Sequence, residues 1–200
     1  MEKKLLIQSL EIYIDMTLAS YISCLRIVLI VPIIYLLDKG LWPEAPSFYN
    51  YLALVLFIVA GLTDYLDGYI ARKTDTETQL GALLDLIADK LLVSLVVVWL
   101  VFLMGDPWVA IPSLIIVSRE LVISTLRQYV IEIKRKKNLS VSFIGKSKTT
   151  IQIIAISTLI LSQEVRDIWI VAIFSLWFAA IFSLYSLFTY VSEWFKHYLN

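Results

Sequence analysis

Residues 64–89 read DYLDGYIARKTDTETQLGALLDLIAD, and this stretch decides how the rest of the chain is arranged. Four of its five aspartates form two closely spaced pairs, which are Asp64 with Asp67 and Asp85 with Asp89. The first two are three residues apart and the last two are four apart, so on helices each pair shares one face. Long apolar runs flank the stretch, and ionised groups are costly beside such runs. These carboxylates therefore need a compensating positive charge.

Composition indicates an integral membrane protein. The chain has 200 residues, of which 60% are hydrophobic, and its mean hydropathy is +0.81. A soluble domain is about 45–50% apolar, so a soluble class is disfavoured. The formal net charge is zero, and we expect no nucleic-acid partner. We expect one membrane domain over residues 1–200.

Hydropathy predicts the fold class. Apolar stretches of roughly the ~20 residues that a spanning helix needs recur along the chain. They lie near residues 18–37, 49–72, 81–104, 108–131, 147–164 and 168–192. Backbone groups in lipid must be satisfied within the segment, which favours helices over strands. We therefore expect an all-α integral membrane protein with six transmembrane helices, preceded by a short amphipathic interfacial helix within residues 1–16.

The positive charges predict the orientation. Lys39 and Arg166 are the only basic residues in three of the predicted connections. These are the connections between the first and second, the third and fourth, and the fifth and sixth helices. The opposite side carries most of the basic residues, among them Lys3, Lys4, Arg72, Lys73, Lys134, Arg135, Lys136, Lys137, Lys146, Lys148 and Lys196. By the positive-inside rule, both termini and the acidic stretch face the cytoplasm.

The acidic stretch itself predicts a metal site. Antiparallel packing of the second and third helices would bring the four carboxylates together, and divalent cations are their natural counter-charge. Ligation by oxygen alone favours Mg²⁺ or Mn²⁺. Gly68, Ala71 and Gly81 leave room for a ligand to approach the backbone. Two alternatives stay open at this point: solvated helix ends paired with nearby cations, and an ion-coupled membrane transporter.

The spacing of these residues resembles a known signature. The pattern D-x2-D-G-x2-A-R-x8-G-x3-D-x3-D is filled at its eight positions by Asp64, Asp67, Gly68, Ala71, Arg72, Gly81, Asp85 and Asp89. It is similar to the signature of the CDP-alcohol phosphotransferases, whose six-helix layout also agrees. That family transfers a substituted phosphate from a CDP-linked donor to an alcohol and releases CMP.

The resemblance implies a role for each residue. The aspartates would form a two-metal site for Mg²⁺ or Mn²⁺, with Asp64, Asp67 and Asp85 as ligands and Asp89 contributing. Asp89 is also the expected general base for the acceptor hydroxyl. The CDP donor would lie against Gly68, Ala71 and Gly81, and Arg72 would pair with its phosphate.

Cations farther along the chain indicate which alcohol is used. Arg119 lies within an apolar stretch, and Lys146 and Lys148 lie at the start of the fifth predicted helix. A helix N-terminus with two lysines favours an anion, so we expect the acceptor to carry a phosphate. Glu120 would either orient Arg119 or Arg127 on the same helix or balance charge.

The segments SRELVISTLR and GKSKTTIQ resemble the bacterial phosphatidylglycerophosphate synthase branch of the family. This implies CDP-diacylglycerol and sn-glycerol 3-phosphate as substrates, a homodimer among membrane lipids, and a bacterial cytoplasmic (inner) membrane location. Ser20 and Ser23 depart from the branch, which has Asn and Thr at these places before the arginine at Arg26. Inositol phosphate, serine or phosphatidylglycerol remains an alternative acceptor.

Overall fold

The computed structural model describes residues 18–40, 46–74, 79–134 and 143–198, and these ranges contain helices and no strands. The long helices are α2 (Leu18–Gly40), α3 (Phe48–Thr74), α4 (Gln79–Met104), α5 (Pro107–Lys134), α6 (Phe143–Leu161) and α7 (Trp169–Tyr198), and a short 3₁₀ turn, η1 (Arg166–Ile168), precedes α7. They coincide with the six predicted apolar stretches to within a few residues. The expected interfacial helix at 1–16 lies outside the described residues.

Hydropathy along the described helices supports a membrane protein. Four segments are long and apolar enough to cross a membrane, namely Ser20–Gly40, Leu83–Met104, Pro107–Leu126 and Arg166–Ser192. The described apolar parts of α3 and α6 are shorter and run over Phe48–Thr63 and Lys148–Leu161. The structure thus supports an all-helical membrane protein with four candidate spans in its described part, while six spans stay a prediction.

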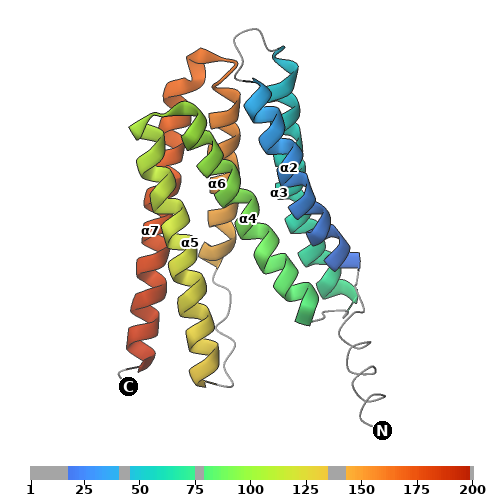
Figure 1. Cartoon of the computed structure of the whole chain (residues 1–200). Helices are drawn as coiled ribbons and strands as arrows, with labels where there is room; N and C mark the ends of the chain where they lie inside the picture. The colour runs from blue at the N-terminus through green and yellow to red at the C-terminus, as the bar shows by residue number, and fades with distance from the viewer. Residues whose placement is uncertain (1–17, 41–45, 75–78, 135–142, 199–200) are drawn as a thin grey trace.

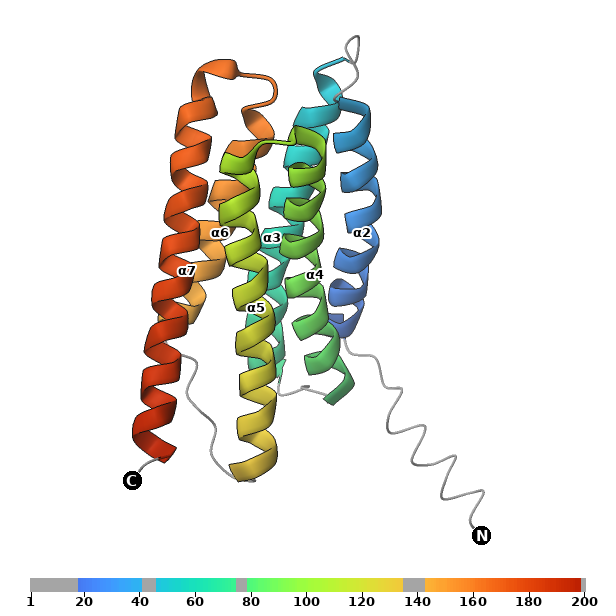
Figure 2. The same cartoon turned by 60° about the vertical axis from the view of Figure 1, so that its left-hand side comes forward.

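The helices form an antiparallel bundle (Figures 1 and 2). Helices α2, α4 and α6 run upward in Figure 1, and α3, α5 and α7 run downward. The start of α2 and the end of α7 therefore lie at the same end, which we call the lower end. The end of α3 and the start of α4 also lie there. This arrangement places the acidic stretch at one end of the bundle.

Packing divides the bundle into two groups of three helices. Helix α2 packs against α3 and α4, and α7 packs against α5 and α6. Contacts between α3 and α6 and between α4 and α5 join the groups. Small residues permit the α3–α6 approach, because a Cβ on Gly61 would lie 2.8 Å from the Cδ1 of Ile153. The joined groups share one core that includes Phe57, Leu100 and Ile156.

The turn between α4 and α5 follows from its sequence. Gly105 has a φ of 61°, a left-handed conformation that ends α4 at little steric cost. Asp106 then caps α5, since its Oδ1 accepts a hydrogen bond of 2.8 Å from the backbone N–H of Trp108. Pro107 begins α5, where its missing N–H costs nothing. The predicted break at this point is confirmed.

A polar contact ties the two groups of helices at the upper end. The Nδ2 of Asn50 donates to the backbone oxygen of Gly40 at 3.3 Å and to Oε1 of Glu164 at 2.7 Å. Asn50 is 2% exposed, so this amide links α2, α3 and the α6–α7 connection within the protein interior. Gly40 leaves space for it, because a Cβ there would lie 2.1 Å from the Oδ1 of Asn50.

We expect Gly40→Ala to destabilise the protein by about 1–3 kcal/mol, because the added methyl group displaces the Asn50 amide from its hydrogen bonds. Thermal unfolding in detergent measures the loss. Asn50→Ala removes the clash together with the tie. The double variant is therefore expected to be less destabilised than the sum of the single variants, and strict additivity would contradict the explanation.

Candidate functional site

The two aspartate pairs occupy neighbouring helix ends. Asp64 and Asp67 lie on the lower part of α3, and Asp85 and Asp89 lie on the lower part of α4. Only residues 75–78 separate the two helices, which keeps their ends close together (Figures 1 and 2). The side chains of Asp64, Asp67 and the neighbouring residues Gly68, Ala71 and Arg72 lie outside the described part of the structure. Gly81, one turn before Asp85, is half-buried.

A buried arginine on α2 faces this region. The NH1 of Arg26 lies 3.5 Å from Oδ1 of Asp85, and the side chains of the two residues are 0% and 46% exposed respectively. Ser20 and Ser23 are also buried on α2 and recur at three-residue intervals with Arg26. The sequence reasoning assigned Arg26 no role. The signal that could have identified it is a cation within an apolar helix, which is costly without a partner.

The described carboxylates suit a hard divalent cation. Asp85 and Asp89 offer oxygen ligands only, and the half-exposed Asp85 carboxylate already attracts the Arg26 guanidinium. No group of three potential metal ligands occurs among the residues whose side chains the structure describes. A complete ligand set would therefore need Asp64 and Asp67, whose positions on α3 are compatible with it.

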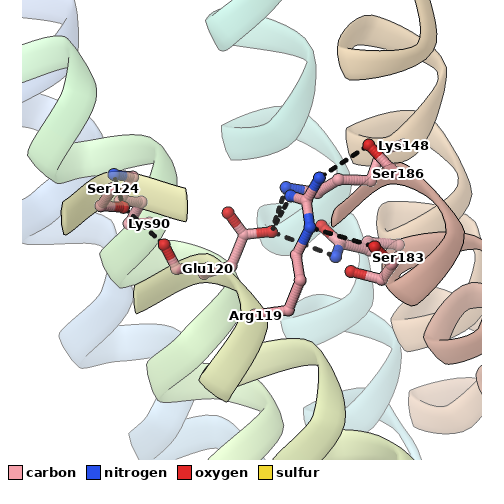
Figure 3. Close-up of polar contacts among 8 residues, drawn as sticks. Lys90, Arg119, Glu120, Ser124, Lys148, Ser183 and Ser186 are labelled. Carbon is pink, nitrogen blue, oxygen red and sulfur yellow. Dashed lines mark hydrogen bonds and ion pairs between the residues drawn. The ribbon is translucent and has the colours of Figure 1, made fainter. Parts of the chain in front are cut away.

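A second polar cluster lies between α5, α6 and α7 (Figure 3). Oε1 of Glu120 receives the NH1 of Arg119 at 3.3 Å, the Nζ of Lys148, and the Nε2 of Gln152 at 3.4 Å. All four side chains belong to buried residues. Lys146 lies in the first turn of α6, and its side chain is outside the described part. Of the three predicted acceptor residues, the structure thus brings Arg119 and Lys148 together.

Arg119 also connects α5 to α7. Its Nε donates to the backbone oxygen of Ser183 at 3.1 Å, and its NH2 donates to Oγ of Ser186 at 2.7 Å. Sequence reasoning did not identify Gln152, Ser183 or Ser186. Gln152 follows Lys148 by four residues and so shares its helix face. The two serines give no comparable signal, because serine recurs elsewhere in α7.

The acidic and basic clusters meet between α4 and α6. The Asp89 carboxylate lies close enough to Lys148 to interact with it electrostatically. The next residue, Lys90, donates a hydrogen bond to Ser124 and so links α4 to α5. The predicted base on α4 therefore lies within electrostatic range of a predicted phosphate ligand on α6. This arrangement can bind an anion beside a carboxylate that accepts a proton.

We expect Arg26→Gln to destabilise the protein by about 1–3 kcal/mol, because it removes the fully buried partner of a half-exposed carboxylate. Thermal unfolding of the purified protein measures this. Arg166→Gln is the matched control, since Arg166 is exposed at the upper end. Equal unfolding midpoints for the two variants would show that the Arg26–Asp85 contact contributes nothing to stability.

The amino-acid sequence is similar to those of several named bacterial enzymes. The chain is 41% identical over 144 residues to the CDP-diacylglycerol–glycerol-3-phosphate 3-phosphatidyltransferase of Wigglesworthia glossinidia brevipalpis, covering 72% of this chain and 77% of the relative. Enzymes of the same name from Haemophilus influenzae and Escherichia coli K12 are 41% and 38% identical over 110 residues. Each of these two alignments covers 55% of this chain and 60% of the relative.

The profile of one family extends over most of the chain. The CDP-alcohol phosphatidyltransferase profile matches residues 16–185, a range that includes both aspartate pairs, Arg26, and the cluster around Glu120. It also includes Ser183, to which Arg119 donates. This match covers far more than half of the 200 residues. The chain belongs to the CDP-alcohol phosphatidyltransferase family.

Proposed function

We propose that this protein transfers the phosphatidyl group of CDP-diacylglycerol to sn-glycerol 3-phosphate and releases CMP. The observation that carries the proposal is the buried pair of cations Arg119 and Lys148, which meet at the Glu120 carboxylate and could bind the phosphate of an acceptor. The names of the relatives give the same donor and acceptor for those enzymes. Family membership favours this activity over an ion-coupled transporter.

The four aspartates supply the metal site in this proposal. Enzymes of this family generally depend on a divalent metal. Asp64, Asp67, Asp85 and Asp89 would hold Mg²⁺ or Mn²⁺, as a two-metal site, through carboxylate oxygens alone. When bound, such ions draw charge from the attacked phosphorus and stabilise the leaving CMP. Arg26 supports the site by holding Asp85 from the α2 side.

The remaining residues bind the donor and move the proton. Asp89 accepts the proton of the acceptor hydroxyl. The hydroxyl oxygen forms a bond to the donor phosphorus, and the bond between that phosphorus and CMP breaks. Gly68, Ala71 and Gly81 leave room for the cytidine against the backbone. Arg72 pairs with the donor phosphate.

The cations on α5 and α6 select an acceptor that carries a phosphate. Arg119, Lys146 and Lys148 would bind the phosphate of sn-glycerol 3-phosphate, and the buried positions of Arg119 and Lys148 strengthen any such contact. Serine and phosphatidylglycerol do not present the phosphate monoester that these cations favour, whereas inositol phosphate does. Glycerol 3-phosphate is preferred because the relatives' names specify it.

The proposed setting is a bacterial cytoplasmic membrane. We place both termini and the site on the cytoplasmic side, because the helix ends at the lower end of the bundle carry Arg72, Lys73, Lys134, Lys146 and Lys196. The chain acts as a single domain among membrane lipids, within a homodimer. CDP-diacylglycerol then reaches the site from the bilayer, and glycerol 3-phosphate reaches it from the cytoplasm.

Purified protein with CDP-diacylglycerol, Mg²⁺ and sn-glycerol 3-phosphate is expected to release CMP in equal amount to phosphatidylglycerol phosphate. Chelation by EDTA is expected to abolish this activity, and Mg²⁺ or Mn²⁺ to restore it. Serine and inositol phosphate are tested in parallel. Turnover with one of those acceptors alone would overturn the choice of alcohol, and no CMP release with any of them would overturn the reaction.

Asp89→Asn is expected to lower kcat by about 10²–10⁴-fold while donor binding is largely retained, because the amide occupies the same volume but cannot accept the proton. Steady-state CMP release and binding of CDP-diacylglycerol are the two measurements. Asp167→Asn serves as the control, since Asp167 is exposed at the upper end. Wild-type turnover by Asp89→Asn would exclude Asp89 as the base.

A further inference from the structure

Three side chains donate to the buried carboxylate of Glu120. Its residue is 8% exposed, and its Oε1 accepts from Arg119, Lys148 and Gln152 (Figure 3). Arg119 is its chain neighbour on α5, whereas the other two donors lie on α6. A single buried oxygen therefore fixes the spacing between cations on two different helices.

This arrangement has a definite electrostatic effect. Arg119 and Lys148 bring two positive charges into a buried region, and like charges held together repel. The negative charge of Glu120 cancels one of them, so the trio of Arg119, Glu120 and Lys148 has a net charge of +1. The trio thus remains attractive to an anion, while its two cations are kept side by side rather than pushed apart.

Arg119 is held firmly on its other side. Its Nε and NH2 donate to Ser183 and Ser186 on α7, so the guanidinium is fixed in three directions. Lys148 has a flexible four-carbon stem, and Glu120 is the carboxylate that receives its Nζ. The anchored arginine and the shared carboxylate together determine where the lysine ammonium lies.

The position of Lys148 matters because Asp89 interacts with it from α4. We propose that Glu120 is a positioning residue of the acceptor-phosphate site, which holds the Lys148 ammonium at a fixed place beside Arg119. This inference rests on the proposed function for its ligand, a phosphate monoester such as that of glycerol 3-phosphate. A lysine held there places the acceptor phosphate so that the acceptor hydroxyl points toward the base.

Glu120→Gln separates positioning from simple charge balance. The substitution keeps the size of the side chain but raises the net charge of the trio from one to two positive. If Glu120 only moderated charge, the variant would attract the anion more strongly, and the KM for glycerol 3-phosphate would fall. If Glu120 positions Lys148, the KM rises because the ammonium leaves its place in spite of the stronger attraction.

We expect Glu120→Gln to raise the KM for sn-glycerol 3-phosphate at least tenfold, with a change of less than threefold in kcat and less than twofold in the KM for CDP-diacylglycerol. Glu120→Asp retains the charge with a shorter reach and is expected to give an intermediate KM. An unchanged or lowered KM in Glu120→Gln overturns the proposal. An equal rise in both KM values also does, because it indicates a general distortion.

A double-mutant cycle tests whether Glu120 acts through Lys148. Lys148→Ala alone is expected to raise the KM for glycerol 3-phosphate at least tenfold, and adding Glu120→Gln is expected to raise it less than twofold further. Additive effects would show that Glu120 does not act through Lys148. If Glu120→Gln does not fold, Gln152→Leu removes one of the three donors to the carboxylate, and a two- to fivefold rise is expected. No rise in that variant contradicts the proposal.

A binding measurement separates this inference from the proposed reaction. The thermal midpoint of the wild type is expected to rise with added sn-glycerol 3-phosphate, and Glu120→Gln to need at least ten times more of the compound for the same shift. Equal concentrations for both proteins overturn the positioning role even if the wild type releases CMP. A tenfold difference without CMP release overturns the reaction and leaves the phosphate site standing.

Discussion

The structure depends on one constraint, which is that charged groups between apolar helices must compensate one another. Arg26 is fully buried and meets Asp85, and the buried Glu120 meets two cations and an amide. The contacts of Arg26 with Asp85 and of Glu120 with Lys148 and Gln152 cross from one helix to another, so the balance of charge also determines how the helices pack. The candidate base on α4, Asp89, interacts electrostatically with one of these cations, Lys148 on α6.

The division of the bundle gives the site its form. Helices α2, α3 and α4 carry the aspartate pairs and Arg26, which contacts Asp85, whereas α5, α6 and α7 carry the cluster around Glu120. The proposed site would lie where the groups adjoin, and the Lys90–Ser124 hydrogen bond links them directly beside Asp89. In the proposed reaction, one group holds the donor and metal, and the other presents the acceptor.

The sequence predicted the helices well because run length and breakers are local properties. The predicted gap between the apolar stretches 81–104 and 108–131 is confirmed, since Gly105, Asp106 and Pro107 form the turn there. The family was also recognisable from the sequence, because its aspartate signature is defined by residue types at fixed spacings along the chain. The roles of the individual site residues remain predictions. The contacts of Arg26 with Asp85 and of Arg119 with Ser183 and Ser186 could not be predicted, because these partners lie on helices far away in the chain, and a serine such as Ser186 resembles any other helical serine.

Helix α7 has two neighbours of opposite character. One face accepts the guanidinium of Arg119 through Ser183 and Ser186, and the other exposes large apolar side chains, among them Phe178, Tyr185 and Phe188. In a bilayer the exposed face meets acyl chains, so a single helix thickness separates fluid lipid from the polar cluster. A change in bilayer thickness that tilts α7 would therefore move Ser183 and Ser186, to which Arg119 donates. The thickness of the membrane would in this way affect the geometry of the polar cluster.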